Sequence, residues 1–127
     1  MIFDTDILIW FHRGADEAER AIETTPLDDR FISIISYLEL VQGVNSKAEL
    51  KKLKETIKVA GFTILPVNEA ISLDAVKYME NYRLKAGLDI NDAFIAATAY
   101  YHGQTLFTGN FKHFRELNIS VRQFTKN

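Results

Sequence analysis

The sequence contains no cysteine and only two prolines among its 127 residues. The absence of cysteine excludes disulfide bonds, zinc sites built on thiolates and a cysteine nucleophile. No proline-rich, serine-rich or low-complexity segment divides the chain, so we expect a single domain over residues 1–127. The hydrophobic content of 47% is typical of a globular protein. A chain of this length buries roughly two thirds of its unfolded surface, which is enough for one core.

Long hydrophobic runs and an excess of positive charge are also absent. No run approaches the roughly 18 apolar residues of a membrane-spanning helix. The first residues lack the basic and apolar regions of a signal peptide, and we therefore expect a cytoplasmic protein with no membrane contact. The 15 Lys and Arg residues are outnumbered by 17 Asp and Glu residues, so any affinity for nucleic acid has to come from local basic clusters.

Strand and helix patterns alternate along the chain. The expected strands begin in the run 2–10 and lie at 30–36, 62–67, 104–108 and 119–124. The expected helices lie at 14–25, 37–44, 46–61, 69–87, 88–103 and 110–117. This alternation predicts an α/β fold, a three-layer α/β/α sandwich whose mostly parallel central sheet has four to five strands.

Two carboxylates, Asp4 and Asp6, interrupt the first hydrophobic run, "MIFDTDILIW". If the strand continues through them, its alternation points both side chains to one side. Alternatively the strand ends at Phe3, and Asp4 caps a short helix. An unpaired charge in a buried strand costs several kcal/mol, so a compensating group is expected nearby.

Three further acids have alternative interpretations of their own. Ser36 and Glu39 have the spacing of a capping box, in which Glu39 satisfies only backbone donors. Asp89 and Asp92 can cap the helix that follows them. All of these acids nevertheless lie at strand ends or helix starts, which a parallel sheet brings to one edge. Gathered carboxylates repel one another, and an all-oxygen cluster suits Mg²⁺ or Mn²⁺, so the sequence predicts a divalent cation at this edge.

Four segments resemble the PIN-domain ribonucleases, in particular the VapC-type toxins of bacterial and archaeal toxin–antitoxin pairs. The segment "DTDILIW" is similar to the opening Asp-Thr-Asn motif of that family, and "ISYLELVQG" to its Ser-x-x-Glu segment. The helix "INDAFIAATAYYHG" resembles the Asp-Ala-x-Ile-Ala-Ala helix, and "TLFTGNFKHF" resembles the closing strand and turn. Their order and spacing also fit, so the resemblance covers the whole chain.

The resemblance implies a set of site residues. The catalytic and metal-binding acids would be Asp4, Glu39 and Asp92, and the supporting residues would be Thr5, Asp6, Thr108 and Asn110. Asp6 stands where the family usually has Asn. Many relatives have an acid where this chain has Asn110 or His113, and we favour Asn110 for that position. His113 is expected to pack or cap at the start of the last helix.

The resemblance also implies an activity and partners. The protein would be a Mg²⁺- or Mn²⁺-dependent endoribonuclease toxin that leaves 5′-phosphate and 3′-hydroxyl ends, forms a homodimer and is blocked by a cognate antitoxin. A bound cation would activate water for attack on the phosphodiester. Acids repel RNA, so basic residues around the cleft are expected to bind it. The candidates are Arg13, Arg83, Lys85, Lys112 and Arg115.

Two alternatives remain open on the sequence. The segment "DTD" also resembles the opening motif of haloacid dehalogenase-like phosphatases, in which the first Asp is a nucleophile. That family has Thr or Val shortly after the second Asp, where this chain has Ile7 and Leu8, and the later acid pair is missing. The other alternative is a catalytically weak PIN-like scaffold that binds RNA or protein, which the missing fourth acid supports.

Overall fold

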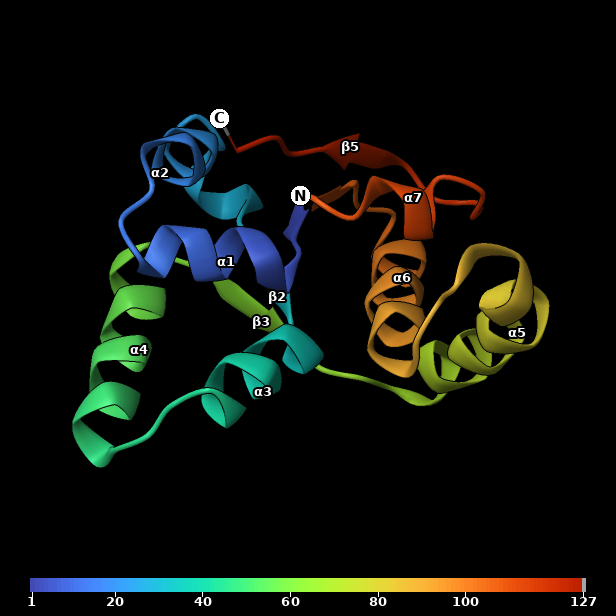
Figure 1. Ribbon diagram of the computed structural model, residues 1–127, viewed down its shortest axis with the longest axis horizontal. Helices are drawn as coiled ribbons and strands as arrows, with labels where there is room; N and C mark the ends of the chain where they lie inside the picture. Colours follow the sequence, from blue (N-terminus) through green and yellow to red (C-terminus); the bar gives the residue numbers. More distant parts are fainter. Residues whose placement is uncertain (127) are drawn as a thin grey trace.

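A five-stranded sheet with helices on both faces forms the protein in the computed structural model, which describes residues 1–126 (Figure 1). The strands are β1 (Ile2–Phe3), β2 (Phe31–Ser33), β3 (Thr63–Leu65), β4 (Leu106–Thr108) and β5 (Val121–Gln123). The helices are α1 (Thr5–His12), α2 (Asp16–Glu23), α3 (Ile34–Gln42), α4 (Lys47–Val59), α5 (Glu69–Ala86), α6 (Ile90–His102) and α7 (Phe111–Phe114), with a 3-10 turn at Leu27–Asp29. The strand order is β3-β2-β1-β4-β5, and every neighbouring pair is parallel. The predicted α/β fold is confirmed.

The sheet separates two hydrophobic clusters. Ile71 and Ile95 belong to the cluster that packs α5 and α6 against one face. Ile7 and Ile22 belong to the other, which holds α1, α2 and α4 on the opposite face. Figure 1 shows α5 and α6 on one side of the sheet and α1, α2 and α4 on the other. The helices and sheet therefore make the three layers that the sequence predicts.

Several helix ends follow the local capping signals. Asn68 Oδ1 accepts a hydrogen bond from the Ile71 backbone N–H at 2.8 Å and so begins α5. Gly87 ends that helix in the left-handed conformation, at φ 70°, which glycine adopts without a steric penalty. None of the helices within residues 1–126 combines the length and apolar content needed to cross a membrane.

The first two strands are shorter than the sequence suggests. β1 ends at Phe3, so the expectation that the run 2–10 begins as a long strand is wrong, and the alternative of a short helix after Asp4 is correct. β2 ends at Ser33, and α3 begins at Ile34 rather than at Ser36. Periodicity alone does not distinguish a short buried strand from a buried helix turn, because both are uniformly apolar.

Candidate active site

The carboxyl ends of β1 and β4 meet at one edge of the sheet because the strands are parallel. Asp4 follows β1, and Thr108 ends β4. The Thr108 hydroxyl donates to Asp4 Oδ2 at 2.6 Å, and both residues are buried. Asp4 Oδ1 accepts from the backbone N–H of Thr5 at 2.8 Å. Both oxygens of the Asp4 carboxylate are therefore held in place.

Thr5 connects this position to α3. Its Oγ1 donates to Glu39 Oε1 at 2.8 Å and lies 2.9 Å from Ser36 Oγ. Ser36 is buried inside α3, whose N-cap is Ser33. The capping-box interpretation of Ser36 and Glu39 is therefore wrong, because the N-cap of the helix lies three residues earlier, at Ser33, and Glu39 contacts Thr5 just after β1.

Asp92 has two roles in the structure. It forms a capping box with Asp89 at the start of α6, in which Asp89 Oδ1 accepts from Asp92 N at 2.8 Å and Asp92 Oδ2 accepts from Asp89 N at 3.4 Å. The capping interpretation of both acids is therefore confirmed. The same Oδ2 atom lies 3.1 Å from Nδ1 of His113 on α7. The Asp92 carboxylate therefore caps α6 and contacts α7 at the same time.

The carboxylates at this edge are electrostatically coupled. Burial raises the pKa of Asp4 to about 7, and the charges of Asp6 and Asp92 raise it as well, while the hydrogen bonds from Thr108 and Thr5 lower it. Burial also raises the pKa of Asp6 and that of Asp92 above the ordinary value. Binding of a proton or a cation at this edge of the sheet is therefore more favourable than leaving all of these carboxylates charged and unpaired.

The donor chemistry fits a divalent cation. Asp4, Glu39 and Asp92 offer only carboxylate oxygens, the ligands that Mg²⁺ and Mn²⁺ prefer. A cation would offset the repulsion that raises the pKa of Asp4. Within residues 1–126, however, no three His, Asp or Glu side chains lie close enough together to hold an ion as they stand. The acids thus surround one region without forming a closed ligand set.

Asp6 joins α1 to the loop after β4. It lies in the first turn of α1, so the expectation that it shares a strand face with Asp4 is wrong. Its Oδ2 accepts from the Gly109 backbone N–H at 2.9 Å. The next residue, Asn110, donates from its backbone N–H to Thr108 Oγ1 at 2.9 Å, and its side chain is exposed. Asp6 is therefore positioned to fix the loop beside the acids.

His113, rather than Asn110, is the residue of this segment whose side chain contacts an acid. The sequence suggested a packing or capping role for His113 instead. The contact joins α6 to α7 across 21 residues, and no local pattern encodes it. The available signal was the resemblance of this segment to the closing turn of PIN domains. Many members of that family have an acid at the position of Asn110 or of His113.

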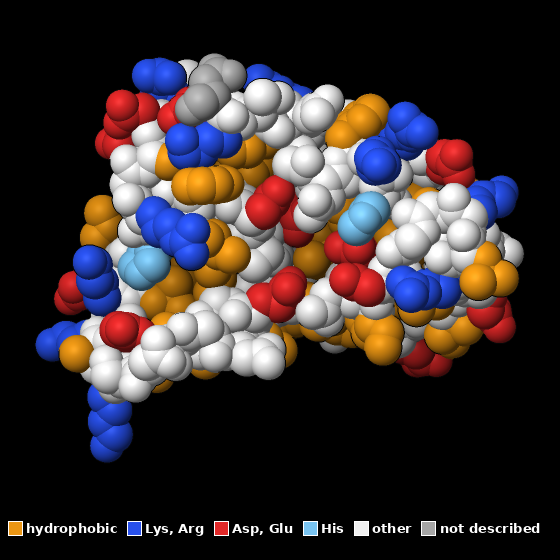
Figure 2. All heavy atoms as spheres, viewed as in Figure 1, with side chains coloured by type: hydrophobic (Ala, Val, Ile, Leu, Met, Phe, Trp, Pro, Cys, Tyr) orange, Lys and Arg blue, Asp and Glu red, His pale blue; other side chains and the backbone are white. Residues whose placement is uncertain are grey.

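Two cavities flank the acids. One of about 570 Å³ lies among α1, α3 and α4, and its wall includes Glu39 and Arg13. The other, of about 530 Å³, is lined by Lys112, His113 and Arg115. Figure 2 shows acidic side chains gathered at the middle of one face, with Lys and Arg side chains on both flanks. Three of the predicted RNA-binding residues therefore line these cavities. Arg13 shares one cavity with Glu39, and Lys112 and Arg115 share the other with His113.

The other two predicted RNA-binding residues lie at the end of α5. Arg83 Nη1 donates to the backbone carbonyl of Leu88 at 3.3 Å, just before α6 begins. The Lys85 ammonium lies 5.4 Å from the ring centroid of Tyr82. Arg83 thus has a local backbone partner, and Lys85 an aromatic one.

The chain matches the family model of the PIN domain over residues 1–119. The chain belongs to the PIN-domain family. It is 32% identical to "Ribonuclease VapC1" of Rickettsia felis over 124 residues, which cover 92% of this chain and 90% of that protein. Among solved structures it is similar to a toxin–antitoxin complex from Klebsiella pneumoniae, with a TM-score of 0.78, 30% identity and coverage of 96% and 95% of the two chains. It is also similar to VapBC-1 from nontypeable Haemophilus influenzae, with a TM-score of 0.77, 28% identity and coverage of 97% and 98%.

These comparisons confirm the resemblance that the four sequence segments indicated. The matched region begins before Asp4 and ends after His113, so it includes all the acids discussed above. Membership of the PIN-domain family also decides against the haloacid dehalogenase-like interpretation of the "DTD" segment. The acids at the sheet edge are therefore those of a PIN domain.

Proposed function

We propose that this protein is a metal-dependent endoribonuclease that cleaves RNA phosphodiester bonds and acts as the toxin of a toxin–antitoxin pair. The observation that carries the proposal is the hydrogen-bonded edge of a PIN-domain sheet at which Asp4, Glu39 and Asp92 are gathered. The ribonuclease name of a relative 32% identical over most of the chain supports the reaction class.

The three acids have distinct supports in this proposal. Asp4 is held by Thr108 and by the start of α1, and Glu39 is held by Thr5, so both are oriented before substrate arrives. A divalent cation, Mg²⁺ or Mn²⁺, would supply charge neutralisation for the phosphate and a lower pKa for the attacking water. Glu39 or Asp92 would accept the proton of that water, and Oδ2 of Asp92 lies beside His113. No protein nucleophile is required, and the products would carry 5′-phosphate and 3′-hydroxyl ends.

The test compares the wild type with Asp92→Asn and Glu39→Gln on total RNA, with Mg²⁺, with Mn²⁺ and with EDTA. Asp28→Asn and Glu80→Gln are matched controls, because both side chains are exposed. We expect discrete metal-dependent cuts by the wild type and by both controls, and a loss of about 10²-fold or more for the site variants. Cleavage that persists in EDTA or in the site variants would contradict the proposal, and no cleavage by any variant would favour an inactive scaffold.

We also propose an antitoxin partner. The printed descriptions of the Klebsiella and Haemophilus structures name a toxin–antitoxin complex and VapBC-1. A cognate antitoxin would inhibit by covering the acids, for example with an Arg side chain against them. Co-expression should therefore suppress RNA cleavage by the wild type, and cleavage by a copurified complex at the rate of the free protein would contradict this role.

A homodimer is the third part of the proposal. Three large apolar side chains of α5 are exposed, Leu73 at 57%, Val76 at 54% and Leu84 at 99%. Exposed apolar side chains gathered on one helix are typical of an interface. Light scattering should therefore give twice the monomer mass for the wild type and the monomer mass for Val76→Asp with Leu84→Asp. A monomeric wild type would contradict the dimer.

A further inference from the structure

Two side chains of α1 and the side chain of its C-cap residue, Arg13, form a row that leads away from the acids. Asp6, Trp10 and Arg13 are separated by four and three residues, the spacing that places side chains on one side of a helix. At 1.5 Å per residue, Trp10 lies about 6 Å beyond Asp6 along the helix axis. The row therefore runs from a carboxylate to an indole and then to a guanidinium.

Two cations lie over the Trp10 ring. The Arg13 guanidinium carbon is 5.7 Å from the ring centroid, and the Lys126 ammonium is 4.9 Å from it. Both distances are in the range of cation–π contacts. Lys126 also lies 3.6 Å from Glu17 Oε2, whereas Arg13 forms no ion pair with a carboxylate of residues 1–126. The guanidinium next to the ring is thus available to an anion.

A cavity extends from this cation to one of the site acids, Glu39. Arg13 and Glu39 both line the cavity of about 570 Å³ among α1, α3 and α4, and so does His12. His12 Nδ1 is buried and has no hydrogen-bond partner within residues 1–126. Buried polar atoms normally have a partner, and a polar ligand in the cavity would provide one. Its volume is in the range of cavities that hold small polar ligands.

We propose that Trp10 and Arg13 form a nucleotide subsite for single-stranded RNA beside the acids, an inference that rests on the proposed ribonuclease function. Arg13 binds a phosphate of the strand through its planar guanidinium. Trp10 is half-buried against the hydrophobic cluster that contains Ile7. A base stacks on the face of its ring that the Lys126 ammonium covers, as bases stack on aromatic rings of single-strand binding proteins. The attraction of Arg13 for a phosphate and the stacking of a base on Trp10 thus offset part of the repulsion between the acids and the RNA backbone.

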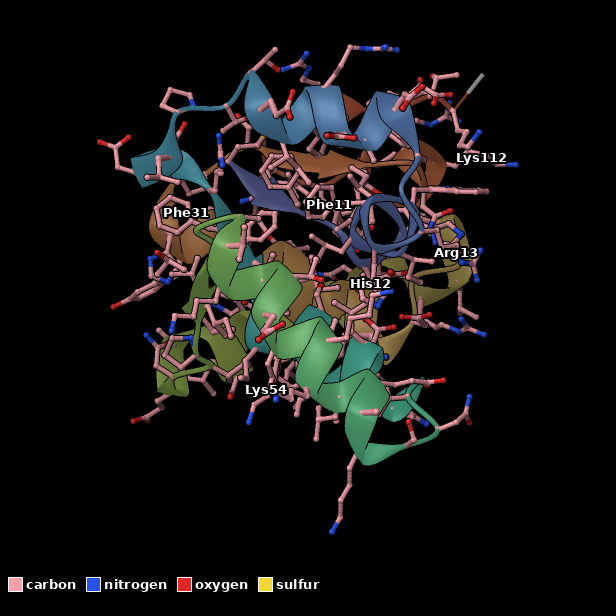
Figure 3. All side chains as sticks on the ribbon, turned by 90° about the vertical axis from the view of Figure 1, so that its left-hand side faces the viewer. Phe11, His12, Arg13, Phe31, Lys54 and Lys112 are labelled. Atoms are coloured by element: carbon pink, nitrogen blue, oxygen red, sulfur yellow. The ribbon has the colours of Figure 1, made fainter. Side chains whose placement is uncertain are left out.

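The cavity lined by Lys112 and Arg115 provides a second point of contact for the RNA strand. Figure 3 shows Arg13 and Lys112 projecting from the same side of the molecule, while Lys54 on α4 lies elsewhere. A strand held at both Arg13 and Lys112 passes the acids, because the Arg13 cavity includes Glu39 and the Lys112 cavity includes His113, which contacts Asp92. The Trp10 subsite therefore holds the strand on the Arg13 side of the acids.

The test uses the fluorescence of Trp10, which is the single tryptophan of the sequence. The probe is a 2′-O-methyl oligouridine of about ten nucleotides, within the site sizes of single-strand binders and resistant to cleavage, added in EDTA. We expect saturable quenching, and far weaker quenching by an abasic oligomer of equal length. Arg13→Gln should raise the Kd about tenfold and lower the salt slope by about one. Lys54→Gln, which removes an exposed cation elsewhere, should leave both unchanged.

Three outcomes would overturn the subsite: no quenching of Trp10, equal quenching by the abasic oligomer, or equal Kd values for the wild type and Arg13→Gln. A circular dichroism spectrum of Arg13→Gln confirms that the exposed substitution leaves the helices intact. The inference and the ribonuclease function fail separately. Cleavage of RNA without Trp10 quenching removes the subsite alone, whereas base-dependent quenching without metal-dependent cleavage keeps the subsite and removes the nuclease.

Discussion

The Thr5 hydroxyl donates to Glu39 Oε1 at 2.8 Å, so the residue that follows Asp4 holds the acid contributed by α3. This one bond links the end of β1 to α3 and sets the direction of the Glu39 carboxylate. The backbone N–H of Thr5 also donates to Asp4 Oδ1, so one residue orients two acids that lie 35 positions apart.

Removal of the Thr5 hydroxyl should lower activity more than stability. Thr5→Val keeps the branched shape and loses the donor to Glu39, and we expect cleavage to fall about 10- to 100-fold, as for other residues that orient ligands. Thr5→Ser is the matched control, because it keeps the hydroxyl. Rates on a defined RNA, with thermal unfolding of each variant, check this. Equal rates for Thr5→Val and the wild type would show that Glu39 needs no such support.

Stability should decrease as the pH rises. Burial raises the pKa of Asp4 from its ordinary value of 3.8 to about 7 in the folded protein. The folded state therefore binds more protons than the unfolded state between these values, and the unfolding free energy falls as the pH rises through 7. The contribution of Asp4 is on the order of 4 kcal/mol. Urea unfolding in EDTA from about pH 5 to pH 8 should show about 2.7 kcal/mol of it, the part that falls between pH 5 and pH 7.

Asp4→Asn is the matched variant for that experiment. Asparagine still caps α1 and still accepts from Thr108, but it does not titrate. We expect the variant to lose the part of the pH dependence that the wild type shows around pH 7. Parallel stability curves for the two proteins would contradict the raised pKa of Asp4.

A divalent cation should stabilise the folded protein. At about pH 8 the acids are charged, and Mn²⁺ at 100 times its Kd would add about 2.7 kcal/mol to the unfolding free energy. Asp92→Asn should lose most of this gain, whereas Glu80→Gln, with an exposed side chain, should keep it. Differential scanning calorimetry with Mn²⁺ and with EDTA provides the measurement. The same melting temperature in both conditions would argue against a cation site.

His113 should set the acidic limb of the pH–rate profile. The charge of His113 and its hydrogen bond lower the pKa of Asp92, against the effect of burial. His113→Ala should therefore raise the pKa of Asp92 and move the acidic limb of cleavage to higher pH. His102→Ala is the control, because that histidine is exposed at the other end of α6. An unshifted limb would mean that His113 does not influence the reacting acid.

The sequence predicted features that are encoded locally. The starts of α4 and α5 follow from Ser46 and Asn68, whose side chains accept from backbone N–H groups three residues ahead. The alternation of strands and helices was also sufficient for the parallel sheet, because parallel strands require crossover connections. The Asp89–Asp92 capping box is another local signal, and it was read correctly.

Features that depend on tertiary contacts were not predictable in the same way. The capping alternative for Glu39 arose because its actual partner, Thr5, lies 34 positions away and leaves no local signal. The strand length after Met1 was overestimated because the short apolar stretches on either side of Asp4 and Asp6 do not distinguish a strand from a buried helix turn. The contact between His113 and Asp92 depends on how α7 packs against α6. In each case the missing information was a partner distant in sequence.

Gly109 approaches Asp6 so closely that a Cβ atom there would overlap the Asp6 carboxylate. The backbone N–H of Gly109 is also the donor to that carboxylate. Substitutions at the two positions are therefore expected to be epistatic. A substitution that adds a side chain at position 109 is expected to require an earlier substitution at position 6, one that shortens or redirects that side chain. In the reverse order, the intermediate protein would have a distorted loop beside the acids.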